Sequence, residues 1–121
     1  MSDQASKHVH HAIDYIEFTV RDIAAAKRFY AAAFGWQFTD YGPGYAGIRG
    51  DEREVGGLAQ ADEVKKGGPL VVLYSRELDA TVAAVSSAGG KIVKKPFAFP
   101  GGRRFHFEDP SGNELAVWSD A

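Results

Sequence analysis

Residues 13–22 read IDYIEFTVRD, and this stretch decides the fold. From residue 15 to residue 20 the even positions are apolar and the odd positions are more polar, which is the period of a β-strand with one buried face. Asp22 then stands where a helix N-cap is expected, because its carboxylate can accept amide hydrogens of the first turn. Apolar residues spaced three and four apart follow as far as Gly35, which indicates an amphipathic helix. The stretch therefore predicts a strand that leads directly into a helix.

The rest of the first half of the chain reads as three more strands. They are expected at residues 36–40, 45–49 and 55–60, with a Gly-Pro-Gly turn between the first two. Gly56 and Gly57 lie inside the last of these strands. Paired glycines at such a position indicate a bulge or the close approach of another group.

The same order of elements recurs in the second half. Gly89 follows the second helical pattern about 54 residues after Gly35 ends the first, and an internal repeat outweighs any single-element assignment. The elements expected are a strand at 70–74, a helix at 78–88, strands at 91–94, 104–108 and 113–118, and a loop at 96–102. The sequence thus predicts an α+β protein of two βαβββ modules. Its predicted parts are a loose tail at 1–12, modules at 13–61 and 70–118, and a linker at 62–69.

The composition excludes several classes of function. The net charge of −2 gives no overall electrostatic reason to expect binding to nucleic acid or to an anionic membrane. No apolar run approaches the roughly 20 residues that span a bilayer. Cysteine is absent, which excludes disulfides, thiolate metal sites and cysteine nucleophiles. The lack of cysteine and a polar start without an apolar signal core favour a cytoplasmic protein.

The start of the chain carries a histidine cluster, His8, His10 and His11. Such a cluster can bind a metal ion. An exposed histidine-rich terminus is more often without function, and we favour that interpretation.

Five segments, taken in order, resemble the vicinal-oxygen-chelate superfamily, which contains the glyoxalases, bleomycin-resistance proteins and extradiol dioxygenases. They are residues 15–22, 27–30, 34–36, 88–91 and 107–114, the last reading FEDPSGNE. The resemblance covers about residues 13–118. It implies that the two modules curl into an open, cup-like mixed β-barrel with the helices outside. Many members of the family are dimers.

The resemblance also implies where a metal would be bound. In the metal-dependent members, four His, Glu or Gln ligands come from the first, fourth, fifth and last strands. The corresponding positions here are Tyr15, Gly57, Leu70 and Ala116. Leucine, alanine and glycine side chains have no lone pair, and neutral tyrosine is a poor ligand for divalent zinc, nickel or iron. We therefore expect no cofactor at the usual position, and leave open a divalent metal held by other residues.

The alternation within the strands predicts which side chains face away from the helices. On each long strand the apolar face is expected to cover a helix and the other face to line the cup. This second face is mixed aromatic and ionisable, which is usual for a small-molecule pocket. The ligand-binding residues predicted on it are Tyr15, Tyr45, Arg49, Tyr74, Arg104 and Trp118.

Glu17 and His106 are the candidate catalytic acid and base, because such side chains can exchange protons near neutral pH. The arginines can hold a carboxylate or a phosphate. Each assignment has a structural alternative. Glu17 can be the partner of an arginine, His106 can hydrogen-bond a tyrosine, and the tryptophan and tyrosines can be packing or dimer contacts. If His106 faces the cup, His106 and Glu17 should border solvent rather than core.

The closing turn, residues 109–112, sets the register of the last two strands. Asp109 is expected to accept a backbone amide hydrogen at the start of a type I turn. If Asp109 lies opposite Asn113, antiparallel pairing places His106 across from Ala116. His106 should then face the cup instead of the second helix, with Arg104 beside it.

Two functions of different classes remain. The first is a small-molecule-binding protein of the sequestering or resistance type, or an accessory ligand-binding domain, that does not use the family's metal. The second is an enzyme, either a lyase, isomerase or epimerase using Glu17 and His106, or a diverged glyoxalase or dioxygenase. We favour binding. A homodimer is expected because open sheet edges are normally covered and because Trp36, Phe97 and Phe99 place apolar surface in or near loops.

Overall fold

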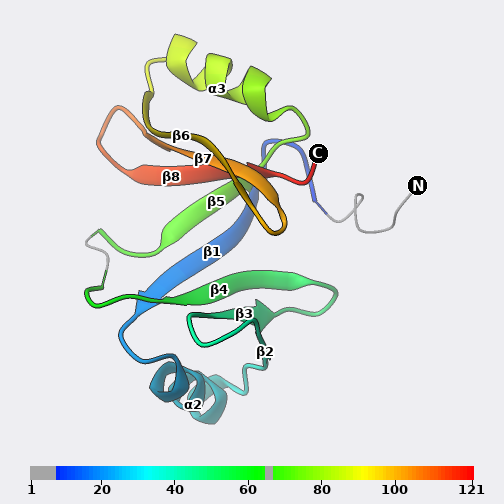
Figure 1. Cartoon of the computed structure of the whole chain (residues 1–121), viewed down its shortest axis with the longest axis vertical. Helices are drawn as coiled ribbons and strands as arrows, with labels where there is room; N and C mark the ends of the chain where they lie inside the picture. The colour runs from blue at the N-terminus through cyan, green and yellow to red at the C-terminus, as the bar shows by residue number, and fades with distance from the viewer. Residues whose placement is uncertain (1–7, 65–66) are drawn as a thin grey trace. The chain divides into compact units, whose positions relative to one another are not determined.

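The structure is a computed structural model that describes residues 8–64 and 67–121. The chain divides into two compact units, one of residues 15–69 and one of residues 70–121 together with the segment before residue 15. Each unit is built on one βαβββ module (Figure 1). The α+β class and the two predicted modules are therefore confirmed. Residues 1–7 of the predicted tail and 65–66 of the predicted linker lie outside the described residues.

The first module begins with the strand and helix that the opening stretch predicts. Its elements are β1 (Ile13–Val20), α2 (Ile23–Phe34), β2 (Phe38–Asp40), β3 (Tyr45–Arg49) and β4 (Glu54–Gln60). β4 lies between a parallel neighbour, β1, and an antiparallel neighbour, β3, which also pairs with β2. Asp22 caps α2 by accepting the amide hydrogen of Ala25 at 3.1 Å. Gly35 ends the helix with a φ of 74°, a left-handed conformation that favours glycine.

One face of the first module's sheet packs on α2. Phe18 of β1 contacts Tyr30 of α2, with their ring centroids 6.2 Å apart, and the paired residues Leu58 and Ala46 are buried on the same face. The register shifts at the end of β3, where Val55 on β4 has no partner in the ladder. The bulge therefore lies one residue before the glycine pair that predicted it.

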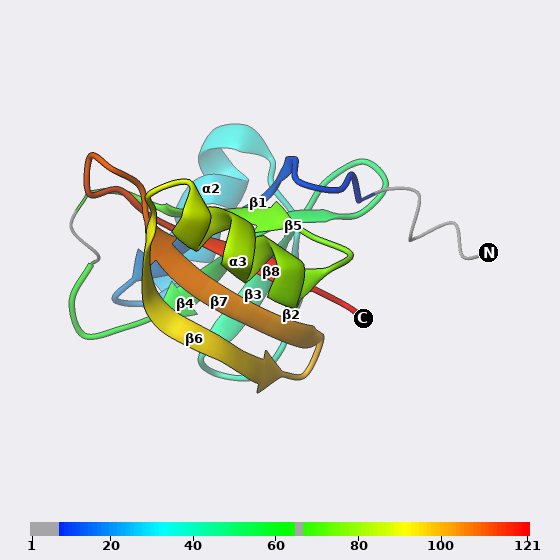
Figure 2. The same cartoon turned by 90° about the horizontal axis from the view of Figure 1, so that it is seen from above.

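The second module repeats this arrangement. Its elements are β5 (Leu70–Tyr74), α3 (Leu78–Ser87), β6 (Lys91–Phe99), β7 (Gly102–Glu108) and β8 (Glu114–Ser119). β8 lies between β5, which is parallel to it, and β7, which is antiparallel and also pairs with β6. α3 lies over the sheet (Figure 2), and its Leu78 forms a core with Phe105 and Val117. Neither described helix is long and apolar enough to cross a membrane.

The predicted loop at residues 96–102 is wrong, because β6 continues to Phe99 and pairs with β7. The strand is irregular, with a register shift between Lys94 and Phe97 that leaves Pro96 outside the ladder. Proline has no amide hydrogen to donate, so it is tolerated at such a shift on an edge strand. The sequence pattern was broken by this irregularity, although the strand itself continues.

Candidate functional site

The face of the second module's sheet that turns away from α3 carries four of the predicted site residues. The register pairs Arg104 with Trp118 and Trp118 with Tyr74, and it places His106 opposite Ala116. The turn holds this register as predicted, since Asp109 accepts the amide hydrogens of residues 111 and 113 at 2.9 Å. The predicted orientation of His106, away from the second helix, is confirmed.

A row of aromatic side chains crosses this face, and we define it as Tyr74, Trp118, Phe99 and Phe97, the last two joined through Arg104. Ring centroids are 5.2 Å apart between Tyr74 and Trp118, and 6.2 Å apart between Trp118 and Phe99. Arg104 completes the row, with its guanidinium carbon 5.6 Å from the Phe97 ring and 6.0 Å from the Phe99 ring. These distances allow cation–π attraction. The two phenylalanines, expected in a loop, thus belong to the candidate site.

His106 stands at one end of the aromatic row. Its ring is stacked on Phe97 with a centroid distance of 5.9 Å, and its Nδ1 lies 2.9 Å from Oε2 of Glu114. Burial lowers the pKa of His106, and Glu114 opposes this shift only in part, while Arg104 and Lys94 add to it. The partner of His106 is therefore a carboxylate, and the predicted alternative of a tyrosine partner is wrong. Because only 3% of His106 is exposed, the expectation that it borders solvent is wrong as well.

At the other end of the aromatic row, the carboxylates of Asp14 and Asp120 accept hydrogen bonds from Trp118 and Tyr74. Buried Asp14 accepts from Nε1 of Trp118 at 3.0 Å, and its second oxygen lies 2.8 Å from Nδ1 of His8. The His8 ring stacks on Tyr74 at 5.1 Å. The Tyr74 hydroxyl donates to Asp120 at 2.6 Å, and burial together with this bond raises the pKa of Tyr74 to about 12. Tyr74 is thus engaged in packing, whereas Trp118 remains half-buried.

The two other histidines near the start of the chain also have partners in this unit. His10 Nδ1 accepts the amide hydrogen of Arg76 at 2.9 Å. His11 Nε2 lies 3.0 Å from Oγ1 of Thr81. The described part of the predicted tail is therefore docked on the second module.

Tyr15, Tyr45 and Glu17 form a hydrogen-bonded chain on the non-helix face of the first module. The Tyr45 hydroxyl donates to Oε2 of Glu17 at 3.0 Å, and the hydroxyls of Tyr15 and Tyr45 form a hydrogen bond with each other. Burial raises the pKa of Tyr15 to about 12. Burial also raises the pKa of Tyr45, and the neighbouring Glu17 charge adds to this shift. Both phenols are therefore neutral at pH 7, and Tyr15 must donate to Tyr45, because the hydrogen of Tyr45 is given to Glu17.

The hydrogen-bonded side chains of Tyr15 and Tyr45 fill the space beside Gly57. This is the position at which the resembled family carries its fourth-strand metal ligand. A Cβ added to Gly57 would overlap the Tyr45 hydroxyl and lie 2.6 Å from the Tyr15 hydroxyl. Leu70 and Ala116, at two other ligand positions, are buried and apolar. The residues present therefore do not fit the family's metal. Within residues 8–64 and 67–121, no cluster of three or more His, Asp or Glu side chains is suited to a metal ion.

Arg49 is the predicted site residue that joins neither group. Its side chain is exposed and makes no polar contact to the described part of the chain. Conversely, sequence reasoning did not select Glu54, Glu114 or Asp14. Glu54 accepts from the Tyr41 hydroxyl and covers Gly47. A signal existed only for Glu114, because the predicted register brings it near His106.

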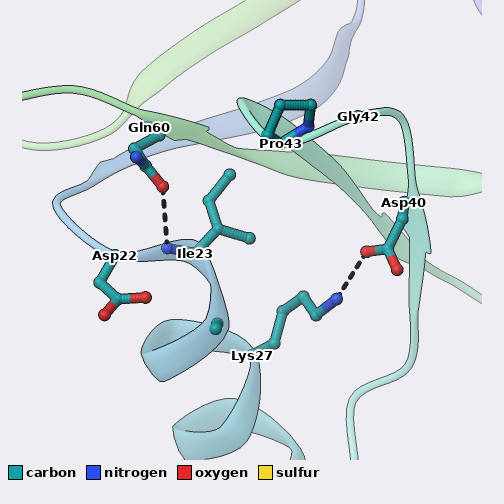
Figure 3. A pocket seen from close by; sticks show the side chains of 8 residues that line it. Asp22, Ile23, Lys27, Asp40, Gly42, Pro43 and Gln60 are labelled. Carbon is teal, nitrogen blue, oxygen red and sulfur yellow. Dashed lines mark hydrogen bonds and ion pairs between the residues drawn. The ribbon is translucent and has the colours of Figure 1, made fainter.

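A hollow of about 370 Å³ lies at the start of α2, and none of the predicted site residues lines it (Figure 3). Its charged groups are already engaged, since Lys27 Nζ lies 2.6 Å from Oδ1 of Asp40 and the Asp22 carboxylate caps α2. Gln60 accepts the amide hydrogen of Ile23 at 3.3 Å. The hollow therefore presents no set of convergent polar groups to a ligand, and the aromatic row is the stronger candidate site.

The sequence profile described as Glyoxalase/Bleomycin resistance protein/Dioxygenase superfamily matches residues 12–117. The chain belongs to this superfamily. The resemblance drawn from the five segments is thereby confirmed, and the two βαβββ modules are those of a superfamily member.

Several relatives in the superfamily match most of the chain. Anthracycline biosynthesis protein DauV of Streptomyces sp. (strain C5) is 33% identical over 117 residues, covering 80% of this chain and 42% of that protein. Anthracycline biosynthesis protein DnrV of Streptomyces peucetius is 32% identical with the same coverage. The chain thus spans less than half the length of these relatives.

Solved structures of the superfamily share the fold. The Mn(II)-bound glyoxalase from Novosphingobium aromaticivorans has a TM-score of 0.70 and 34% identity, covering 93% of this chain and 40% of that one. Methylmalonyl-CoA epimerase from Mycobacterium tuberculosis has a TM-score of 0.72 at 17% identity, covering 90% and 87%. At that identity the second likeness shows the fold alone.

Proposed function

We propose that this chain is a small-molecule-binding member of the superfamily that holds a planar aromatic ligand without the usual metal-ligand set. The observation that carries the proposal is the aromatic row, which ends at Arg104 and His106. Aromatic side chains supply flat contact area to flat ligands, and one polar group at the end fixes their orientation. On the first module, the tyrosine chain at Gly57 supports a mode of binding that does not use the family's metal.

The relatives support the same ligand class. Two of them are named as anthracycline biosynthesis proteins, and anthracyclines are built on flat fused rings. The chain spans only 42% of each relative. We therefore propose a shared class of ligand and not the activity of the full-length relatives. Neighbouring rings of the row are inclined to each other by 67° and 58°, so a fused-ring ligand can stack on one ring and meet the next at its edge.

Calorimetric titration with naphthalene-2-sulfonate and anthraquinone-2-sulfonate tests the proposal. We expect binding that weakens several-fold in Trp118→Leu. The matched control is Trp36→Leu, since Trp36 stacks on Tyr30 in the first module and lies outside the aromatic row. The proposal is wrong if neither probe binds at millimolar concentration, or if both variants weaken binding equally.

The second candidate function is an enzyme in which His106 acts as the acid or base; Glu17, the other residue predicted for this role, belongs to the other compact unit. The contact between His106 and Glu114 favours it, because a carboxylate-oriented neutral imidazole is a common general base. Such an enzyme should exchange a ligand proton with solvent. Deuterium incorporation into a bound ligand in D₂O, lost in His106→Phe, would favour turnover over binding alone.

A further inference from the structure

Glu114 determines which nitrogen of His106 carries the proton. A carboxylate oxygen can only accept, so the hydrogen in the 2.9 Å contact belongs to Nδ1 of His106. Burial lowers the pKa of His106, which keeps the ring neutral at pH 7. A neutral imidazole has a single N–H, and Nε2 therefore holds a lone pair and is a hydrogen-bond acceptor.

This acceptor is buried and unused. His106 is 3% exposed, and within the described residues its Nε2 has no hydrogen-bond partner. Buried polar atoms are nearly always hydrogen-bonded, and each exception requires an explanation. The explanation that we favour is a ligand, because the unused Nε2 belongs to the side chain at the end of the aromatic row.

We infer that Nε2 of His106 accepts a hydrogen bond from a phenolic hydroxyl of the planar aromatic ligand. The inference rests on the proposed function and adds the chemical group that the site selects. Arg104 favours a phenol over an aromatic N–H, since a nearby guanidinium stabilises the negative charge that a donating hydroxyl oxygen accumulates. Glu114 acts as a positioning residue through His106.

Phe97 is the side chain that we expect to move when the ligand enters. It stacks on His106 and is 38% exposed, and it follows the register shift at Pro96. β6 pairs with β7 on one side only, so the Phe97 ring lies at an edge of the sheet. A ligand ring can take the place of the Phe97 ring beside His106 and Arg104.

The test compares 6-hydroxynaphthalene-2-sulfonate with naphthalene-2-sulfonate, which differ by one phenolic hydroxyl. In the wild-type protein the hydroxylated probe should bind about five- to tenfold more tightly, the gain expected of one hydrogen bond to a buried acceptor. His106→Phe keeps a ring beside Phe97 but lacks the nitrogen. It should abolish the preference, so that the two probes bind with equal affinity.

The outcomes separate the two proposals. Equal affinity of the two probes in the wild-type protein would overturn this inference and leave the proposed function standing, whereas no binding of either would overturn both. If His106→Phe does not fold, the wild-type protein supplies the test. Acidification that protonates His106 beside Glu114, Arg104 and Lys94 should remove the preference, because an imidazolium has no acceptor. A preference that persists once NMR shows the His106 ring to be protonated would overturn the inference.

Discussion

A Cβ added to Gly57 would overlap the hydroxyl of Tyr45. The metal-dependent members of the superfamily carry a metal ligand near this place on the fourth strand, and here two tyrosines from neighbouring strands occupy the space. The two tyrosine side chains can therefore occupy this space only because residue 57 is a glycine. The absence of a ligand side chain on β4 is what lets Tyr15 and Tyr45 reach each other and Glu17.

Gly57→Ala should destabilise the protein by about 1–3 kcal/mol, the usual cost of inserting a methyl group into a filled space. Gly44→Ala is the matched control, because nothing lies within 4 Å of a Cβ at that glycine. Urea denaturation of both variants measures the free energies of unfolding. An equal effect of the two substitutions would show that the tyrosines yield freely and that Gly57 is not constrained by them.

The purified protein should retain no stoichiometric zinc, nickel, manganese or iron after dialysis against a chelator. Of the four family ligand positions, Gly57, Leu70 and Ala116 have no donor atom, and Tyr15 is a neutral phenol hydrogen-bonded to Tyr45. Inductively coupled plasma mass spectrometry gives the stoichiometry. Retained metal that is lost when Glu17 and His106 are replaced would reveal a different ligand set.

Tyr15 should make the folded state less stable at alkaline pH. Its pKa is about 12 in the folded protein against an ordinary value of 10.0, so the unfolded chain loses this proton first. The free energy of unfolding should therefore fall as pH rises from 10 towards 12, by up to about 2 kcal/mol for this group. Tyr15→Phe should show a smaller fall in denaturant titrations at pH 9 and pH 11. An equal fall in the free energy of unfolding in the two proteins would contradict the raised pKa of Tyr15.

Much of the fold follows from the sequence because its signals are local. β3 and β5 have the predicted bounds, and the Asp109 turn holds the predicted register of β7 and β8. The continuation of β6 was missed because Pro96 resembles a loop signal. Only the pairing with β7, which a linear pattern does not contain, shows that the strand resumes.

The candidate site was less accessible to sequence reasoning than the fold. Alternation and the predicted turn placed His106, Arg104, Trp118 and Glu114 on one face, but they did not show that Glu114 is the polar group that bonds His106. Asp14 contacts Trp118 from a position 104 residues earlier in the chain. Such contacts depend on side-chain geometry in the folded chain, and no spacing in the sequence encodes them.

We expect a homodimer, although two of the three apolar residues that suggested it are half-buried. Trp36 stacks on Tyr30 at 4.6 Å, and Phe99 lies in the aromatic row. Instead, Phe29 and Phe34 of α2 are 59% and 64% exposed. Exposed apolar side chains that lie together mark a contact surface between proteins, and a second copy of the chain would cover them. Light scattering should give about twice the chain mass of 13.1 kDa, and Phe34→Lys should shift the mass towards the monomer. A monomer mass for the wild-type protein would refute the prediction.

Phe97→Ala should expose His106 to reagents that modify neutral imidazole. The Phe97 ring is the exposed neighbour of His106, and the imidazole nitrogen that carries the lone pair is sealed from solvent. Removal of the ring should therefore raise the rate of His106 modification by diethyl pyrocarbonate several-fold, as followed by peptide mapping with mass spectrometry. Phe99→Ala is the control, because that ring contacts Trp118, and the other histidines serve as internal references. An unchanged rate, or an equal rise in the control, would mean that another group closes the site and that Phe97 is not the side chain that moves when a ligand enters.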